Sequence, residues 1–157
     1  MQIKLIHPTA ILVLPQSNGN EAIRYASFCG HSWTVKLLLT DSRVDPAMRA
    51  NAALGDASWC GYTEIVKLLL ADSRVDPTTR DNDAIRRASY FGYTEIVALL
   101  LADSRVNPAA NNNEAIREAS YCGHIKAVKL LLADSRVDPT ANNSIAIRYA
   151  SRCGRTE

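Results

Sequence analysis

The chain contains no long apolar segment. Hydrophobic residues make up 47% of its 157 residues, but no run approaches the roughly 18 consecutive apolar residues of a membrane-spanning helix. The apolar run near the start, residues 10–14, lies between Pro8 and Pro15 and is shorter than the ~7 residues of a signal-peptide core. We therefore expect neither a membrane association nor secretion.

A strong excess of one charge is also absent. Lys and Arg number 18 and Asp and Glu number 16, so the formal net charge is +2. Proteins whose main partner is nucleic acid or an anionic membrane usually carry a pronounced basic excess. The composition therefore disfavours nucleic acid as a partner.

Motifs for catalysis and for cofactor binding are missing as well. The sequence contains no phosphate-binding loop, zinc-ligand spacing or nucleophile elbow. Cys29 and His31 are close enough to suggest a nucleophile and a base, but the same turn recurs as Cys60-Gly61-Tyr62 without the histidine. We therefore predict no enzymatic activity, no cofactor and no bound metal.

The cysteines do not form a disulfide pattern. They occupy one position of an internal repeat, at Cys29, Cys60, Cys122 and Cys153, and Phe91 takes the remaining place. Stacked helices lie roughly 8–10 Å apart, whereas a disulfide needs Cα atoms within about 7 Å. Four unpaired thiols are typical of a reducing compartment, so we expect the cytosol or the nucleus.

What the chain does contain is a strict internal repeat. Its landmarks recur every 31 residues: Gly30, Gly61, Gly92, Gly123 and Gly154; Pro46, Pro77, Pro108 and Pro139; and leucine triplets at 37–39, 68–70, 99–101 and 130–132. A fixed period of this length is the signature of a solenoid, in which one small unit is stacked repeatedly. Because each unit contacts mainly its neighbours, no single central core is needed.

The third copy, residues 82–112, shows how one unit is built. Asn82 is predicted to cap a short helix over residues 83–90, because its side-chain oxygen can accept a hydrogen bond from the first helical turn. Gly92 ends that helix, since glycine takes the left-handed conformation without steric cost. A second helix over residues 94–102 is apolar nearly all round and must be covered by neighbouring units. Pro108 cannot continue a helix, and residues 106–112 are predicted to form an extended, hairpin-like finger.

This order of helix, glycine turn, helix and finger resembles the ankyrin repeat. The matching stretches are EAIRYASFCGHSWTVKLLL at residues 21–39 and DAIRRASYFGYTEIVALLL at residues 83–101. The family's G-H-x-x-x-V-x-L-L-L segment is matched closely, whereas Glu21, Ala22 and Arg24 stand where Thr, Pro and His would be. The resemblance implies an all-α, ankyrin-type solenoid of stacked helix-turn-helix units with short extended fingers.

The repeat also gives the expected domain organisation. Residues 20–157 would form the ankyrin-repeat domain, with full units at 20–50, 51–81, 82–112 and 113–143 and a partial unit at 144–157. Residues 1–19 would be the degenerate tail of a preceding repeat. The sequence stops where the second helix of a fifth unit would begin, so we expect a fragment of a longer repeat protein as readily as a complete one.

Two columns of arginine run through the repeats: Arg43, Arg74, Arg105 and Arg136 in the fingers, and Arg24, Arg86, Arg117 and Arg148 in the first helices. The finger column could be a stripe that binds anions or nucleic acid, or a ladder neutralised by its own aspartates. Most finger arginines have two aspartates nearby, which favours the ladder. Gly55 interrupts the helix column, and a glycine within a helix costs roughly 0.5–1 kcal/mol relative to alanine. The second unit is therefore the predicted weak point.

The resemblance implies a non-enzymatic module that binds an unidentified protein on the concave face of the solenoid. The alternative is a structural spacer, or a truncated repeat fragment, with no partner of its own. The position before the glycine turn usually points to the concave face of ankyrin repeats, and here it carries aromatic residues. Trp and Tyr are enriched in binding hot spots, so these residues are the predicted anchors: Phe28, Trp59, Tyr90 and Tyr121.

Two further sets of residues are predicted to support that contact. One lies three residues earlier: Tyr25, Asp56, Arg87 and Glu118. The other consists of variable finger residues: Met48, Arg49, Thr79, Arg80, Asn111 and Asn142. In the competing interpretation the rings stack on one another and merely hold the repeats together. The sequence makes no prediction about the oligomeric state.

Overall fold

The computed structural model describes residues 19–140, and residues 1–18 and 141–157 lie outside the described part of the chain. The described part contains eight α-helices and no strand. Their bounds are α1 (Gly19–Phe28), α2 (Ser32–Leu39), α3 (Met48–Cys60), α4 (Thr63–Leu70), α5 (Thr79–Phe91), α6 (Thr94–Ala102), α7 (Ala110–Cys122) and α8 (Ile125–Ala133). From α3 onward, equivalent helices start 31 residues apart, as the repeat predicts.

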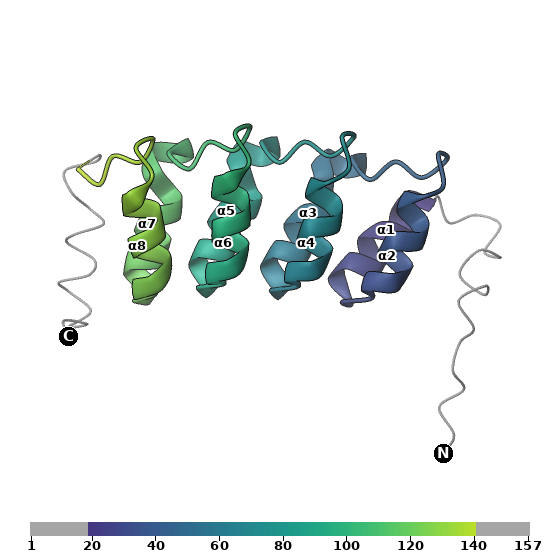
Figure 1. Cartoon of the computed structure of the whole chain (residues 1–157), viewed down its shortest axis with the longest axis horizontal. Coiled ribbons are helices and arrows are strands. Elements are labelled where there is room, and N and C mark those ends of the chain that lie inside the picture. The colour runs from purple at the N-terminus through teal and green to yellow at the C-terminus, as the bar shows by residue number, and fades with distance from the viewer. Residues whose placement is uncertain (1–18, 141–157) are drawn as a thin grey trace, which may run out of the picture.

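Four helix pairs lie side by side in a row, and the connections between pairs run along one edge of it (Figure 1). Helices α1, α3, α5 and α7 pack against one another in one layer, and α2, α4, α6 and α8 form the second. The predicted stack of helix pairs is therefore confirmed for these four pairs. Of the expected tail at residues 1–19, residues 1–18 lie outside the described residues, and Gly19 is the first residue of α1. The partial unit at 144–157 and the predicted partner contact Asn142 also lie outside the described residues.

The core is built from the same positions in every pair. In α6 the side chains of Ile96, Val97 and Leu100 are completely buried, and in α5 Ile85 and Ala88 are buried against them. Burying a side chain of the size of Leu or Ile contributes about 1.5–3 kcal/mol. The small alanines allow the first helices of neighbouring pairs to approach closely, so one continuous core runs through the stack.

The glycine turn is confirmed, and two features favour glycine there: the left-handed backbone and a side chain packed close to it. Gly92 has φ 73° and ends α5 in the left-handed conformation. A Cβ atom on Gly92 would lie only 2.5 Å from the imidazole ring of His124 in the next pair. The Nε2 atom of that ring lies 2.9 Å from the carbonyl oxygen of Tyr90. The next repeat therefore packs a ring into the space that the missing side chain leaves.

The prediction that Asn82 caps its helix is wrong. Asn82 is buried, has φ 59° and follows Arg80 and Asp81 in a left-handed turn. This turn directs its amide towards the connection 25 residues later, where Oδ1 accepts a hydrogen bond from the backbone N–H of Asn107 at 2.7 Å. The equivalent bonds in the flanking pairs run from Asp76 N–H to Asn51 and from Asp138 N–H to Asn113. The repeated asparagines Asn51, Asn82 and Asn113 therefore hold the fingers to the first helices through these hydrogen bonds.

The predicted extended finger is replaced by a more compact connection. It consists of one turn at residues 104–105, a second at residues 108–109, and a left-handed turn at residues 111–113, at the start of α7 in the next unit. Asn107 shapes the second turn, because its Oδ1 accepts the N–H of Ala109 at 3.0 Å. The predicted finger residues Arg49, Arg80 and Asn111 all have positive φ and lie in the left-handed turns instead.

The finger arginines form a ladder rather than a free basic stripe. Arg105 makes an ion pair of 2.6 Å with Asp103, and its Nη1 donates to the carbonyl oxygen of Val75 in the preceding unit at 2.8 Å. Arg136 repeats both contacts one unit later. At Arg74, which has an aspartate on each side, only Asp72 pairs with the guanidinium, because Asp76 accepts the N–H of Thr78 within its own turn. Arg74, Arg105 and Arg136 thus each tie two consecutive fingers together, whereas Arg43 pairs with Asp41 of its own finger.

Candidate functional site

The aromatic row, which we define as Phe28, Trp59, Tyr90 and Tyr121, lies at the ends of the four first helices. The exposed fractions of these residues are 50%, 46%, 42% and 53%, respectively. The packed layer of α1, α3, α5 and α7 therefore presents one half-exposed ring from each helix, with the regular spacing of the repeat.

Two rings of the aromatic row also make structural contacts. Trp59 packs edge-on against Phe91, with ring centroids 4.6 Å apart, and Tyr90 packs edge-on against the same ring at 4.9 Å. Phe91 stacks in turn on Tyr93. Trp59 and Tyr90 thus meet through Phe91, which sequence analysis did not assign to this surface. Its signal in the sequence was the replacement of cysteine by phenylalanine in one repeat.

The predicted supporting residues of the first helices lie beside the aromatic row. The guanidinium of Arg87 lies over the ring of Trp59, 5.3 Å from its centroid, and that of Arg24 lies over Tyr25 at 4.5 Å. Asp56 is shared between these two arginines, at 3.4 Å from Arg24 and 3.8 Å from Arg87.

Glu118 continues this set of supporting residues on α7. Burial, and then the neighbouring carboxylate of Glu114, raise the pKa of Glu118. Along this edge the aromatic rings are therefore flanked by charges of both signs.

The predicted finger contacts are mostly engaged within the protein. Arg49 pairs with Glu21 at 2.7 Å, and Arg80 donates to the carbonyl oxygen of Arg49 at 2.9 Å. Asn111 donates through Nδ2 to Glu114 at 3.1 Å. Met48 and Thr79 are half-buried at the starts of α3 and α5. Arg49, Arg80 and Asn111 are exposed, although each makes one of these contacts.

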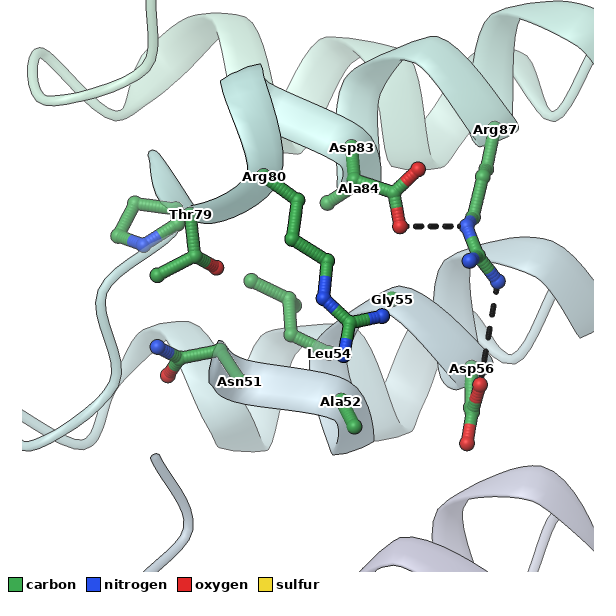
Figure 2. Close-up of a pocket in the computed structure, with 11 residues that line it drawn as sticks. Asn51, Ala52, Leu54, Gly55, Asp56, Thr79, Arg80, Asp83, Ala84 and Arg87 are labelled. Carbon is green, nitrogen blue, oxygen red and sulfur yellow. Dashed lines mark ion pairs between the residues drawn. The ribbon is translucent and has the colours of Figure 1, made fainter. Parts of the chain in front are cut away.

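A hollow opens between α3 and α5 where Gly55 interrupts the arginine column (Figure 2). We call it the Gly55 hollow. Four of the sequence-predicted residues line it: Asp56, Thr79, Arg80 and Arg87. Asp83 lines it as well, and the recess is small and open to solvent. The sequence indicated a weak point here, whereas the structure shows a recess with two carboxylates and two guanidinium groups at its wall.

We also searched the described residues for a metal-binding cluster and for a membrane-spanning helix. Between residues 19 and 140, no cluster of three or more His, Cys, Asp and Glu side chains could hold a metal ion. No helix in this part of the chain is long and apolar enough to cross a membrane.

Comparison with known proteins agrees with this architecture. A family model described as ankyrin repeats, in three copies, matches residues 54–143, which is more than half of the chain. A search of curated proteins found no significant match. Ankyrin repeats generally mediate protein–protein interactions, and the family is typically non-enzymatic. With its four stacked helix pairs, left-handed glycine turns and matched repeats, the chain belongs to the ankyrin-repeat family.

Proposed function

We propose that this protein is a non-enzymatic module that binds another protein along the aromatic row. The observation that carries the proposal is the exposure of four large rings at equivalent positions of consecutive helices. Burying an exposed apolar ring contributes to affinity in proportion to the area removed from water, and Trp and Tyr dominate binding hot spots. A row of such rings offers a partner four anchor points.

Nucleic acid is a weaker candidate, because the arginines are already engaged. Arg105 directs its guanidinium to Asp103 and to a carbonyl oxygen of the preceding unit. Releasing it for a phosphate would remove a contact between fingers. A phosphate-binding surface would also show steep weakening with salt, and we expect retention on an anionic matrix to show no such dependence.

The test of the proposal compares affinity with stability. A partner is first captured from the native cell with the full chain, and the double variant Trp59→Ala, Tyr90→Ala is then compared with the unmodified protein. If the aromatic row is a contact surface, the double variant loses ~2 kcal/mol or more of binding free energy.

A matched control separates binding from packing, since both rings contact Phe91. The variant Phe91→Cys restores the residue of the other repeats and removes these ring contacts while leaving the aromatic row in place. It should lower the melting temperature about as much as the double variant does, yet bind the partner normally. If the double variant binds normally and only melts lower, the aromatic row is structural, and the protein is better explained as a spacer.

We also propose a reducing location, the cytosol or the nucleus. Cys29 and Cys60 are free thiols, and such thiols persist in compartments where glutathione and thioredoxin keep them reduced. Fluorescent tagging of the full chain in its native cell tests this proposal, and accumulation in the secretory pathway would contradict it.

A further inference from the structure

The two central rings of the aromatic row are separated by a short, defined step. Trp59 of α3 and Tyr90 of α5 both pack edge-on against Phe91, with centroid distances of 4.6 and 4.9 Å. The centroids of Trp59 and Tyr90 are therefore at most 9.5 Å apart, the sum of the two distances. Helices that pack against each other, as α3 and α5 do, lie roughly 8–10 Å apart. The step between the two rings is thus about 8 to 9.5 Å.

This step distinguishes between the backbone conformations of a bound peptide. A polyproline II helix has three residues per turn and a rise of about 3.1 Å per residue, so its side chains return to one face every ~9.3 Å. A β-strand returns to one face every two residues, or about 6.7 Å, and an α-helix every ~5.4 Å. Neither of these two spacings, nor twice its value, falls within the step. Only the polyproline II repeat places a side chain on each ring.

The polar groups of the two rings are hydrogen-bond donors. The indole nitrogen of Trp59 can only donate, and the hydroxyl of Tyr90 can donate as well. Both rings are half-exposed, and within residues 19–140 neither group is hydrogen-bonded to another residue. Proline has no N–H, and a polyproline II backbone has no internal hydrogen bonds. A proline-rich segment therefore offers these donors free carbonyl acceptors, whereas the carbonyls of an α-helix are already bonded within the helix.

The charges beside the central rings are already paired with one another. The guanidinium of Arg87 lies over the ring of Trp59. Its Nε lies 2.6 Å from a carboxylate oxygen of Asp83, and its Nη1 lies 3.8 Å from one of Asp56. A partner therefore needs no opposing charge at this point, so an uncharged segment suits the centre of the row better than an acidic or a basic one.

We propose that the aromatic row binds a proline-rich segment of the partner in the polyproline II conformation, with every third residue packed on a successive ring. The proposal rests on the proposed function and names the chemistry of the partner at that same surface. The repeat extends the step from the central rings to Phe28 and Tyr121, so a segment of about ten residues spans the row. This conformation is largely preformed in the free peptide, and such segments dock in grooves lined by aromatic side chains.

The experiment titrates the isotope-labelled full chain with a twelve-residue peptide of four Pro-Ala-Gln repeats, acetylated and amidated at its ends. The indole N–H signal of Trp59 should shift in a saturable manner. Trp33 is the internal reference, because it is 80% exposed on α2 in the other layer, and its indole signal should not move. A scrambled peptide, in which the same prolines are two and four positions apart, should bind about fivefold more weakly.

Two variants separate the donor from the ring. Trp59→Phe keeps an aromatic ring but removes the indole N–H, so it should bind about three- to tenfold more weakly. Trp33→Phe is the matched control, the same change at an exposed tryptophan outside the aromatic row, and it should bind like the unmodified chain. The backbone amide signals of Tyr90 and Phe91 report binding in both variants, and melting curves show that both are folded.

Several results would overturn the proposal. They are the absence of a saturable shift at Trp59, equal binding of the regular and scrambled peptides, and tighter binding of an amphipathic helical peptide of alanine, leucine and lysine, which would assign the row to a helix. These outcomes do not depend on the captured partner. A chain that loses its partner when Trp59 and Tyr90 are replaced, but does not bind the proline peptide, would keep the proposed function and lose only this partner class.

Discussion

Replacing Asn82 by alanine tests the contact that anchors a finger to the first helix. The side chain is 6% exposed, and its Oδ1 accepts the N–H of Asn107 at 2.7 Å. Alanine leaves that N–H without its acceptor, and an unsatisfied buried group costs about 1–3 kcal/mol. Asn82 also has φ 59°, where alanine costs about 1–2 kcal/mol. Because water can partly replace the acceptor, we expect the free energy of unfolding to fall by about 2–4 kcal/mol.

Three companion variants separate the two contributions. Asn82→Gly tolerates the left-handed backbone but lacks the acceptor, so it should lose less stability than Asn82→Ala. Asn82→Asp keeps an oxygen in place and should lose least. Asn82→Ser is the decisive comparison, because serine is a good helix cap but its hydroxyl is too short to take over the bond to Asn107. We expect Asn82→Ser to be nearly as unstable as Asn82→Ala.

Urea unfolding of the full chain, followed by far-ultraviolet circular dichroism, gives these free energies. Hydrogen exchange of the Asn107 amide gives the local effect, and it should accelerate in every variant except Asn82→Asp. Two results would refute the reasoning: a loss below about 0.5 kcal/mol for Asn82→Ala, or full stability of Asn82→Ser. The second would restore the role of a helix cap.

Three further predictions concern glycine, acid stability and thiol reactivity. Gly92→Ala should destabilise the chain by about 2 kcal/mol or more, because of its positive φ and the imidazole ring beside it. Gly55→Ala gains about 0.5–1 kcal/mol of helix propensity but places a Cβ atom 3.2 Å from Asp83 Oδ2, so its net effect should be much smaller. Thermal melting compares the two variants, and equal losses would contradict this explanation. The hydrogen bond from Arg105 lowers the pKa of Asp103 in the folded chain. The ion pair therefore stabilises the fold fully above the unfolded pKa of about 3.9, and this stabilisation is lost as the pH falls through the lower folded pKa. Below about pH 4, the urea midpoint of Asp103→Asn should therefore fall less steeply with pH than that of the unmodified chain. Burial raises the pKa of Cys60, so at pH 8 its alkylation, followed by mass spectrometry, should be slower than in the unfolded chain, and equal rates would show that the site is open.

The sequence predicted much of the fold because the deciding interactions are local or periodic. Gly92 could be identified as a helix end because a helix commonly ends with one residue in the left-handed conformation, which glycine adopts most easily. The apolar pattern of residues 94–102 predicted α6 with its observed bounds. The aromatic row could be listed because its members share one repeat position, although the contact of two members with Phe91 could not.

The tertiary structure decided which group each polar side chain meets. Asn82 looked like a helix cap because its neighbours in sequence form a helix, but a left-handed turn directs it to a residue 25 positions away. Most finger arginines looked balanced by two aspartates, yet Arg74, Arg105 and Arg136 each direct a further donor to a carbonyl of the preceding unit. From the sequence, Gly55 is only a residue that weakens a helix. The recess at Gly55 became visible only in the structure, where carboxylate and arginine side chains surround it. Periodicity fixes which residues share a position, whereas hydrogen-bond partners depend on the path of the chain between repeats.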